Sequence, residues 1–162
     1  MIDLPRAAPA RVLACGAFLK NAACLLDGSH VHFSKLHGDL STPEACAALE
    51  DSVQALVERA GGPVDAVAHD LHPDFHSTRV ALGWAHRLGV PAVAVQHHHA
   101  HIAVVQAEAG LGEAPLIGLA LDGVGLGDDG QPWGGEVLAL QGAHCTRVAH
   151  LPRLALPGGD IA

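Results

Sequence analysis

Aromatic side chains are nearly absent from this 162-residue chain, which contains no tyrosine and only 3% aromatic residues. Its core must therefore be built from aliphatic side chains, and a hydrophobic content of 49% supplies enough of them. Basic residues are also few, 9 against 17 acidic ones, and the formal net charge is −8. Nucleic-acid-binding proteins carry the opposite balance, because Lys and Arg displace counterions from phosphates. We therefore expect no nucleic acid among the partners.

Long apolar runs and paired cysteines are missing as well. No run approaches the roughly 20 residues that span a bilayer, and residues 1–11 lack the apolar stretch of a signal peptide. The four cysteines form no Cys-x-x-Cys pair, which excludes zinc-finger and thioredoxin-like motifs. We expect a soluble, cytoplasmic protein that does not interact with a membrane. Histidines are abundant, however, with 13 in the chain, and only their placement can distinguish metal or proton chemistry from compositional drift.

Turn and capping signals divide the chain into strands and helices. Three short apolar segments predict consecutive antiparallel strands, with Asp27-Gly28 as a hairpin turn. Thr42 is a suitable N-cap for a first helix and Ser77 for a second, which ends near Leu88. The predicted strands are 11–15, 22–26, 30–36, 64–69, 91–95, 115–121, 136–140 and 145–151, and the predicted helices are 43–60, 78–88 and 97–109.

This order, βββαβαβα followed by βββ, is typical of an α/β fold with helices packed on a mixed sheet. The repeated run of three strands suggests that residues 1–112 form a first lobe and residues 113–162 begin a second, incomplete one. Three strands alone would leave one apolar face of their sheet uncovered, so we expect the sequence to be truncated. The segment 156–160 is expected to connect to a further part.

The strongest local signal is Val95-Gln-His-His-His-Ala-His-Ile102. Residues four apart share one face of a helix, so His97 and His101 can hold one Zn²⁺ or Fe²⁺ ion. His98 and His99 lie on other faces, where hydrogen bonds that support the ligands are the expected use. The cluster directly follows a strand, at the edge where open α/β sheets bind ligands. The alternative, a histidine-rich helix start exposed to water, stays open.

A second signal is the glycine-rich segment 122–130, which follows a strand. Closely spaced glycines let backbone N–H groups approach an anion, and the Asp122 carboxylate can hold a metal or its waters. The pattern is neither a Walker nor a Rossmann motif. A plain hairpin turn at Asp129-Gly130 is the favoured alternative when this segment is taken alone.

A third signal, residues 69–79, combines three histidines, two aspartates and an arginine in a loop that leaves a strand. His72 and His76 are expected to be neighbours, and Arg79 can pair with a phosphate or a carboxylate. A polar loop with solvated carboxylates and Ser77 as helix cap is an equally weighted alternative. Which of the three histidines faces a cleft stays open.

Finally, the loop between the first two strands ends in Lys20-Asn21, which can hold a phosphate by charge and amide hydrogen bonds. An exposed loop without a ligand is the alternative that this segment favours when considered alone.

Together, and in this order, the four segments resemble the carbamoyltransferase domain of HypF-type hydrogenase maturation factors. The residues that carry the resemblance are 14–21, 68–79, 95–102, 122–136 and 156–160.

The resemblance implies the actin-like ATPase (ribonuclease H-like) fold and a cleft between two lobes. His97 and His101 would bind a divalent metal there, and Asp122 and His98 are the catalytic candidates. The expected cofactor is carbamoyl adenylate, a nucleotide derived from ATP, with its phosphate near both lobes. Its predicted ligands are Lys20, Asn21, Arg79, Asp122, Gly123, Gly125 and Gly127.

In the resembled family, a separate upstream domain forms carbamoyl adenylate, and this domain transfers the carbamoyl group to the C-terminal cysteine thiol of a HypE-type partner. The group later becomes a cyanide ligand of a nickel–iron hydrogenase. The adenylate-forming domain would have to come from a separate chain. The resemblance also places a third, carboxylate metal ligand outside this sequence, which leaves two histidines and water. A non-catalytic remnant that binds metal or nucleotide is the alternative function.

Overall fold

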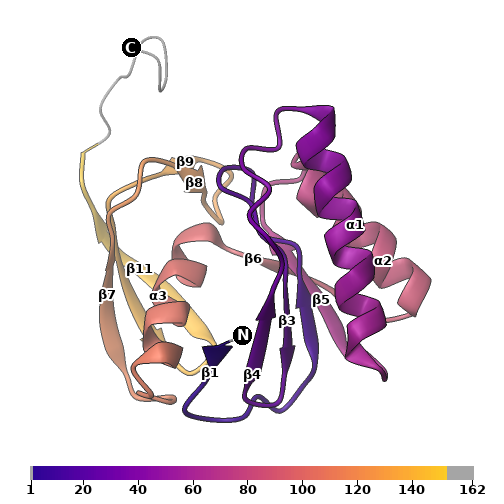
Figure 1. The fold of residues 1–162 in the computed structure, drawn as a ribbon. Helices are drawn as coiled ribbons and strands as arrows, with labels where there is room; N and C mark the ends of the chain where they lie inside the picture. The colour runs from indigo at the N-terminus through magenta and orange to yellow at the C-terminus, as the bar shows by residue number, and fades with distance from the viewer. Residues whose placement is uncertain (1, 153–162) are drawn as a thin grey trace.

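The computed structural model describes residues 2–152, which form two main sheets with three helices (Figure 1). The larger sheet has six strands in the order β1-β4-β3-β2-β5-β6, and the smaller has three in the order β11-β10-β7. Helices α1 and α2 cover one face of the larger sheet, and α3 lies on the side of the smaller sheet that faces the larger one. The helices are α1 (Pro43–Ala60), α2 (His76–Leu88) and α3 (His97–Glu108).

The strands follow the predicted order with two additions. The predicted strands correspond to β2 (Val12–Ala14), β3 (Cys24–Asp27), β4 (His30–Phe33), β5 (Ala66–Asp70), β6 (Ala92–Val95), β7 (Leu116–Ala120), β10 (Glu136–Gln141) and β11 (His144–His150). Sequence reasoning missed β1 (Ile2–Asp3), and it indicated the turn at Asp129-Gly130 but not the strands β8 (Gly125–Leu126) and β9 (Pro132–Trp133) on either side of it. These segments have only two residues each, too short to show an alternating apolar pattern.

The predicted caps are confirmed for α1 but not for α2. Thr42 accepts a hydrogen bond from the backbone N–H of Ala45, and Gly61 ends α1 in the left-handed conformation with φ 60°. The prediction that Ser77 caps α2 is wrong, because Phe75 occupies the N-cap position and Ser77 is fully buried in the first turn. The Phe75 ring stacks on His72 at 4.2 Å between ring centroids, so packing and not a side-chain cap sets where this helix begins.

The main core lies between the larger sheet and its two helices. Leu13 of β2 and Leu25 of β3 face each other in register and pack with Leu49, Val53 and Val67. All five are at most 1% exposed. The core is thus aliphatic, as the near absence of aromatic residues predicts.

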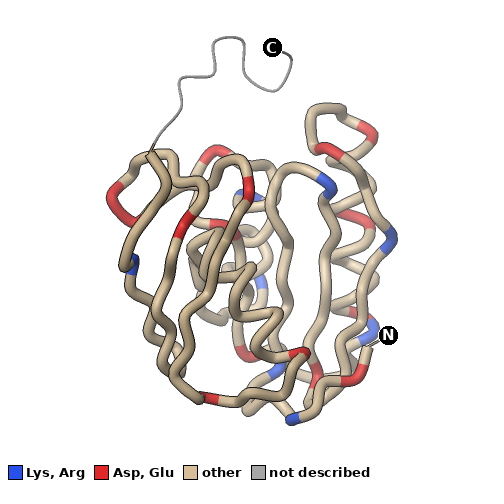
Figure 2. The backbone as a smooth tube through the Cα atoms, turned by 90° about the vertical axis from the view of Figure 1, so that its left-hand side faces the viewer, with Lys and Arg blue, Asp and Glu red and all other residues tan. Residues whose placement is uncertain are grey.

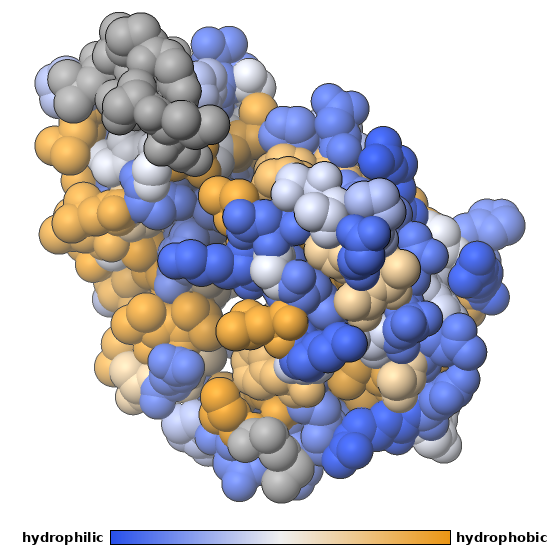
Figure 3. All heavy atoms as spheres, turned by 45° about the horizontal axis from the view of Figure 1, so that its top comes forward, coloured by the Kyte–Doolittle hydropathy of each residue, from blue (hydrophilic) through white to orange (hydrophobic). Residues whose placement is uncertain are grey.

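The smaller sheet packs one face on α3 and leaves the other open. A Cβ atom on Gly118 would lie 2.5 Å from the Ile102 side chain, so only glycine fits where α3 crosses β7. On the opposite face Ile117 and Leu119 are each 63% exposed, which confirms the predicted uncovered apolar face. Figure 3 shows apolar side chains gathered on this side of the molecule. The predicted connector at 156–160 lies outside the described residues.

No helix among residues 2–152 is both long and apolar enough to cross a membrane. The face of the chain in Figure 2 shows no cluster of Lys and Arg of the kind that marks a nucleic-acid interface.

Candidate metal centre

Three parts of the fold meet at the carboxyl edge of the larger sheet. Because β2, β5 and β6 run parallel, their carboxyl ends lie at the same edge. Asp70 is the last residue of β5, and α3 starts with His97 two residues after β6 ends. Asp122 follows β7 of the smaller sheet, which α3 holds against this edge. Segments far apart in sequence thus bring two histidines and two carboxylates together.

His97, His101 and Asp122 form a triangle of donor atoms. Nε2 of His97 lies 3.2 Å from Nε2 of His101, and Oδ2 of Asp122 lies 3.1 Å and 3.6 Å from these two nitrogens. Ligands about 2.0–2.1 Å from a tetrahedral Zn²⁺ ion are roughly 3.3–3.4 Å apart, so this triangle suits one ion. Within residues 2–152, no other group of three metal-binding side chains comes together.

Asp122 therefore changes the expected ligand set. The sequence predicted a site of two histidines and water, with Asp122 directed at a phosphate. In the structure, Asp122 offers a third donor from within the chain, and the further carboxylate ligand expected outside this sequence stays a prediction. The side chain of His101 is 53% exposed, which leaves one side of the site open to a substrate.

Asp70 orients the first of the two histidines. Its Oδ2 accepts a hydrogen bond from Nδ1 of His97 at 2.8 Å, which leaves Nε2 of His97 free as a metal donor. Burial raises the pKa of the Asp70 carboxyl, but hydrogen bonds from His97 and from the backbone of His72 outweigh this and hold the pKa below its usual range. The same hydrogen bond raises the pKa of His97, which makes its imidazole a stronger donor. The alternative of a solvated carboxylate does not hold for Asp70, because this residue is only 8% exposed.

Substitution of Asp70 by asparagine should weaken metal binding without unfolding the chain. The amide can still accept the hydrogen bond from His97, but it lacks the charge that makes this imidazole basic. We expect the Zn²⁺ dissociation constant to rise about tenfold, the lower end of the range for such supporting carboxylates. A competition titration with a chelating dye measures the change. Asp74→Asn, an exposed carboxylate of the same loop, is the matched control, and an equal effect of both variants would contradict a specific role for Asp70.

His98 is buried beneath the donor triangle and does not reach the open side. Its side chain is 0% exposed, and Nε2 lies 2.7 Å from Oδ1 of Asp122. This contact is not aligned as a hydrogen bond. Burial lowers the pKa of His98, which favours the neutral ring. The catalytic role of His98 stays a prediction, and the full burial of its ring favours the supporting role expected from its helix face.

The glycines after Asp122 make room mainly for the protein's own side chains. A Cβ atom on Gly125 would lie 2.6 Å from Cβ of His97, and one on Gly127 would lie 2.1 Å from Nε1 of Trp133. Segment 125–133 is a β8–β9 hairpin, so the turn predicted at Asp129-Gly130 is confirmed. Gly123 has no neighbour that would contact an added Cβ atom. Of the three glycines predicted to bind a phosphate, Gly123 alone lies in open space.

The loop that carries Lys20 and Asn21 leaves β2 at the same edge of the sheet. The Asn21 side chain is buried, donates to the carbonyl groups of Cys15 and Ala17 and accepts a hydrogen bond from His37. Since both amide hydrogens are used inside the loop, the prediction that Asn21 binds phosphate is not supported. Lys20 is exposed and stays a prediction.

Arg79 and the histidines of the third predicted segment are not brought to the donor triangle. Arg79 lines a groove of about 450 Å³ between α1 and α2, together with Glu50 and Trp84. This position gives no support to the predicted phosphate contact of Arg79. The expectation that His72 and His76 are neighbours is wrong. Nδ1 of His69 contacts the carbonyl oxygen of Asp70, His72 stacks on Phe75, and Nε2 of His76 lies 3.0 Å from Glu50.

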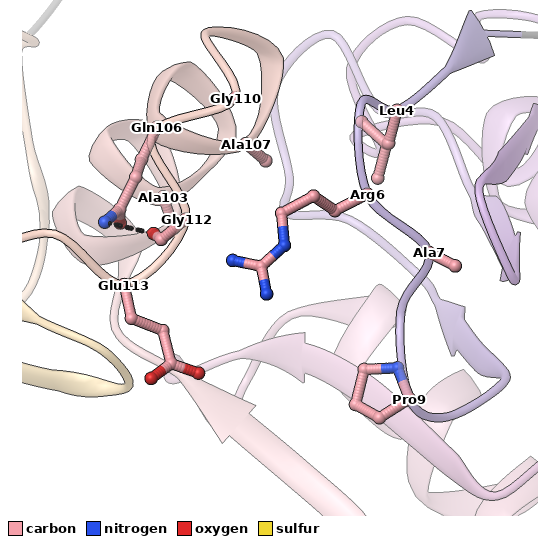
Figure 4. Close-up of a pocket in the computed structure, with 10 residues that line it drawn as sticks. All are labelled: Leu4, Arg6, Ala7, Pro9, Ala103, Gln106, Ala107, Gly110, Gly112 and Glu113. Carbon is pink, nitrogen blue, oxygen red and sulfur yellow. Dashed lines mark hydrogen bonds between the residues drawn. The ribbon is translucent and has the colours of Figure 1, made fainter.

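A separate pocket of about 250 Å³ lies at the opposite end of α3 (Figure 4). Its walls are an N-terminal segment that includes Arg6 and the residues around Gly112, and Gln106 of α3 donates a hydrogen bond to the Gly112 carbonyl group. The residues predicted for metal and phosphate binding are all absent from its lining. The candidate site is therefore the donor triangle at the other end of the helix.

Two family models match the chain. The family model described as the HypF Kae1-like domain matches residues 7–108, and the model for the second subdomain of the carbamoyltransferase Kae1-like domain matches residues 118–162. The chain is 62% identical to a carbamoyltransferase HypF homolog of Cupriavidus necator, over 94% of this chain and 39% of that protein. It is 55% identical to carbamoyltransferase HypF2 of the same organism, over 99% of this chain and 20% of the relative.

Solved structures show the same fold. The crystal structure of full-length HypF in the phosphate- and nucleotide-bound form superposes with a TM-score of 0.83 at 36% identity, over 93% of this chain and 19% of that one. YeaZ from Pseudomonas aeruginosa shares the fold alone, with a TM-score of 0.54 at 22% identity over 94% of this chain and 73% of that one. The predicted actin-like ATPase fold with a mixed sheet is thereby confirmed. The chain belongs to the HypF Kae1-like domain family, and its curated relatives are carbamoyltransferases.

Proposed function

We propose that this chain transfers a carbamoyl group from carbamoyl adenylate to the C-terminal cysteine thiol of a HypE-type partner, at a divalent metal held by His97, His101 and Asp122. The observation that carries the proposal is the triangle of three donor atoms with sides of 3.1, 3.2 and 3.6 Å. Its size suits Zn²⁺ or Fe²⁺. A bound ion would supply a Lewis acid for the carbonyl or phosphate oxygens of the adenylate.

The low reactivity of the chain's own buried thiols supports the proposal that the nucleophile comes from a partner. Burial raises the pKa of the Cys15 thiol to about 12 and that of Cys24 to about 11. Since the thiolate is the reactive form, these two groups are poor nucleophiles at neutral pH. No cysteine belongs to the donor triangle among the described residues. The exposed side of His101 leaves room for a cysteine carried on another chain.

The remaining parts of the reaction are assigned as follows. Asp70 holds His97 in the tautomer that presents Nε2 to the ion. The backbone of Gly123, where an added Cβ atom would meet no neighbour, is the proposed anion contact of the second lobe. Lys20 is the proposed contact of the first lobe. The chain spans 39% and 20% of two curated relatives. An adenylate-forming domain is the proposed source of carbamoyl adenylate.

A transfer assay tests the whole proposal. The chain, loaded with Zn²⁺ or Fe²⁺, is mixed with a peptide that ends in cysteine and with carbamoyl adenylate made in the same reaction by the adenylate-forming domain of a full-length relative. We expect mass spectrometry to detect one carbamoyl group on the cysteine peptide, but not on a peptide ending in serine or after chelation of the metal. A chain that binds metal with no transfer would support the alternative of a non-catalytic metal- or nucleotide-binding protein.

A further inference from the structure

Gln96, the residue before the histidine motif, uses its whole side-chain amide within the protein. Its Oε1 accepts a hydrogen bond from the backbone N–H of His99 at 2.8 Å and thereby caps α3. Its Nε2 lies 2.9 Å from Nδ1 of His98 and 3.1 Å from the carbonyl oxygen of Leu126. Gln96 is only 8% exposed, so solvent does not compete for these contacts.

These contacts determine which nitrogen of His98 carries the proton. A backbone N–H can only donate and a carbonyl oxygen can only accept, so the amide orientation of Gln96 follows from His99 and Leu126. The Gln96 amide nitrogen must then donate to His98, and Nδ1 of His98 must accept. A neutral imidazole that accepts at Nδ1 carries its proton on Nε2. That Nε2 faces Oδ1 of Asp122 at 2.7 Å.

Asp122 depends on this contact for its orientation. Among residues 2–152, its carboxylate accepts no hydrogen bond from a backbone N–H group, and its close partners are three histidines. Its Oδ1 and Nε2 of His98 are both buried and lie 2.7 Å apart, and neither atom has an aligned hydrogen-bond partner. A buried polar group without any partner costs about 1–3 kcal/mol of stability, so these two atoms are favoured to stay in contact with each other.

We infer that Gln96 and His98 are positioning residues that hold the Asp122 carboxylate in place as a metal ligand. Gln96 places the proton of His98 on Nε2, the ring nitrogen that lies 2.7 Å from Oδ1, and Oδ2 then faces His97 and His101. Because Gln96 also binds the Leu126 carbonyl group of β8, it connects the start of α3 to the segment that follows Asp122. The inference rests on the proposed metal site but concerns how the protein builds it.

The variant Gln96→Asn tests the inference. Asparagine is a good N-cap and keeps the hydrogen bond to His99, but it is one methylene shorter and cannot reach His98 or Leu126. Gln106→Asn is a matched control on the same helix, since Gln106 is also 8% exposed and donates to two backbone carbonyl groups at the far end of α3. We expect Gln96→Asn to weaken Zn²⁺ binding about tenfold and Gln106→Asn to change it less than about twofold. Thermal unfolding of the metal-free variants shows whether the two are destabilised alike.

Nitrogen-15 NMR of the histidine rings supplies a readout that a purely structural role would not move. In the metal-free wild-type chain we expect His98 as the Nε2–H tautomer, and in Gln96→Asn a mixture of tautomers. An Nδ1–H tautomer in the wild type, or equal loss of Zn²⁺ affinity in both glutamine variants, would overturn the inference. Should the wild type bind no metal, the proposed function fails, and the tautomer of His98 still decides this inference.

If Gln96→Asn does not fold, a second pair of variants tests whether His98 positions Asp122. The amide of His98→Gln reaches the position of Nε2 and can donate to Asp122, whereas the shorter His98→Asn cannot. We expect His98→Gln to bind Zn²⁺ at least about fivefold more tightly than His98→Asn. Equal affinities of the two would contradict a role of His98 in placing Asp122.

Discussion

Replacement of both His97 and His101 by alanine is expected to abolish stoichiometric metal binding by this chain. The double variant keeps only one of the three donors, Asp122. Its loss of metal affinity should therefore exceed the roughly 10–100-fold loss that is typical when a residue supporting a ligand is replaced. We expect one equivalent of Zn²⁺ or Fe²⁺ per wild-type chain and a dissociation constant at least about 100-fold higher for the variant. Elemental analysis after dialysis and a chelator competition titration measure the two quantities.

The chain offers a control with the same spacing. His72 and His76 are also four residues apart, but their rings contact Phe75 and Glu50 and do not converge. The variant His72→Ala/His76→Ala should therefore bind metal like the wild type, as should His30→Ala and His144→Ala. Equal losses in all of these variants would show that the chain binds metal through general histidine affinity without a defined site.

The second large effect concerns stability. Glu136 is fully buried and accepts hydrogen bonds from Nε and Nη2 of Arg147 at 2.6 and 2.9 Å and from the backbone of Gly134. The Arg147 guanidinium also lies over the Trp133 ring at 4.3 Å. Substitution Glu136→Gln removes the negative charge and leaves a largely buried guanidinium without its counter-ion. We expect the free energy of unfolding at pH 7 to fall by about 3 kcal/mol, as measured by urea denaturation.

This stabilisation should depend on pH in a defined direction. Burial alone raises the pKa of Glu136, but its hydrogen bonds and Arg147 outweigh burial and hold the pKa below its usual range. A carboxyl group with a lowered pKa in the folded state stabilises the fold above its unfolded pKa, about 4.3, and loses this contribution as the pH falls through the folded value. The difference between wild type and Glu136→Gln should therefore shrink below about pH 4. Glu108→Gln, an exposed position on α3, is the control, and a Glu136→Gln variant as stable as this control would refute the assignment.

Local features of this protein were predictable from local sequence. The spacing of His97 and His101 places both on one helix face through backbone geometry alone, whatever surrounds the helix. Thr42 and Gly61 bound α1 because caps act on groups within a few residues. The open apolar face at Ile117 and Leu119 was foreseeable because three strands cannot cover both of their own faces.

Side-chain roles that depend on distant neighbours were not predictable in the same way. The sequence predicted that Asn21 contacts a phosphate. In the structure its buried amide instead donates hydrogen bonds to the carbonyl groups of Cys15 and Ala17. The sequence predicted that Arg79 contacts an anion, but its position on α2 places it in the groove between α1 and α2. Neither outcome has a signal in the local sequence, because burial and facing depend on how helices pack on the sheet.

The sequence by itself thus determined an aliphatic α/β domain with two histidines on one helix face and a glycine-rich hairpin. Only the tertiary structure decided that Asp70, 27 residues before His97, orients this ligand and that Asp122 completes the donor set. It also assigned Gln96, which carries no motif of its own, to His98 and Leu126. The physical reason is that a helix fixes its own i, i+4 neighbours, whereas contacts between parallel strand ends and a second sheet exist only once the two sheets are packed around α3.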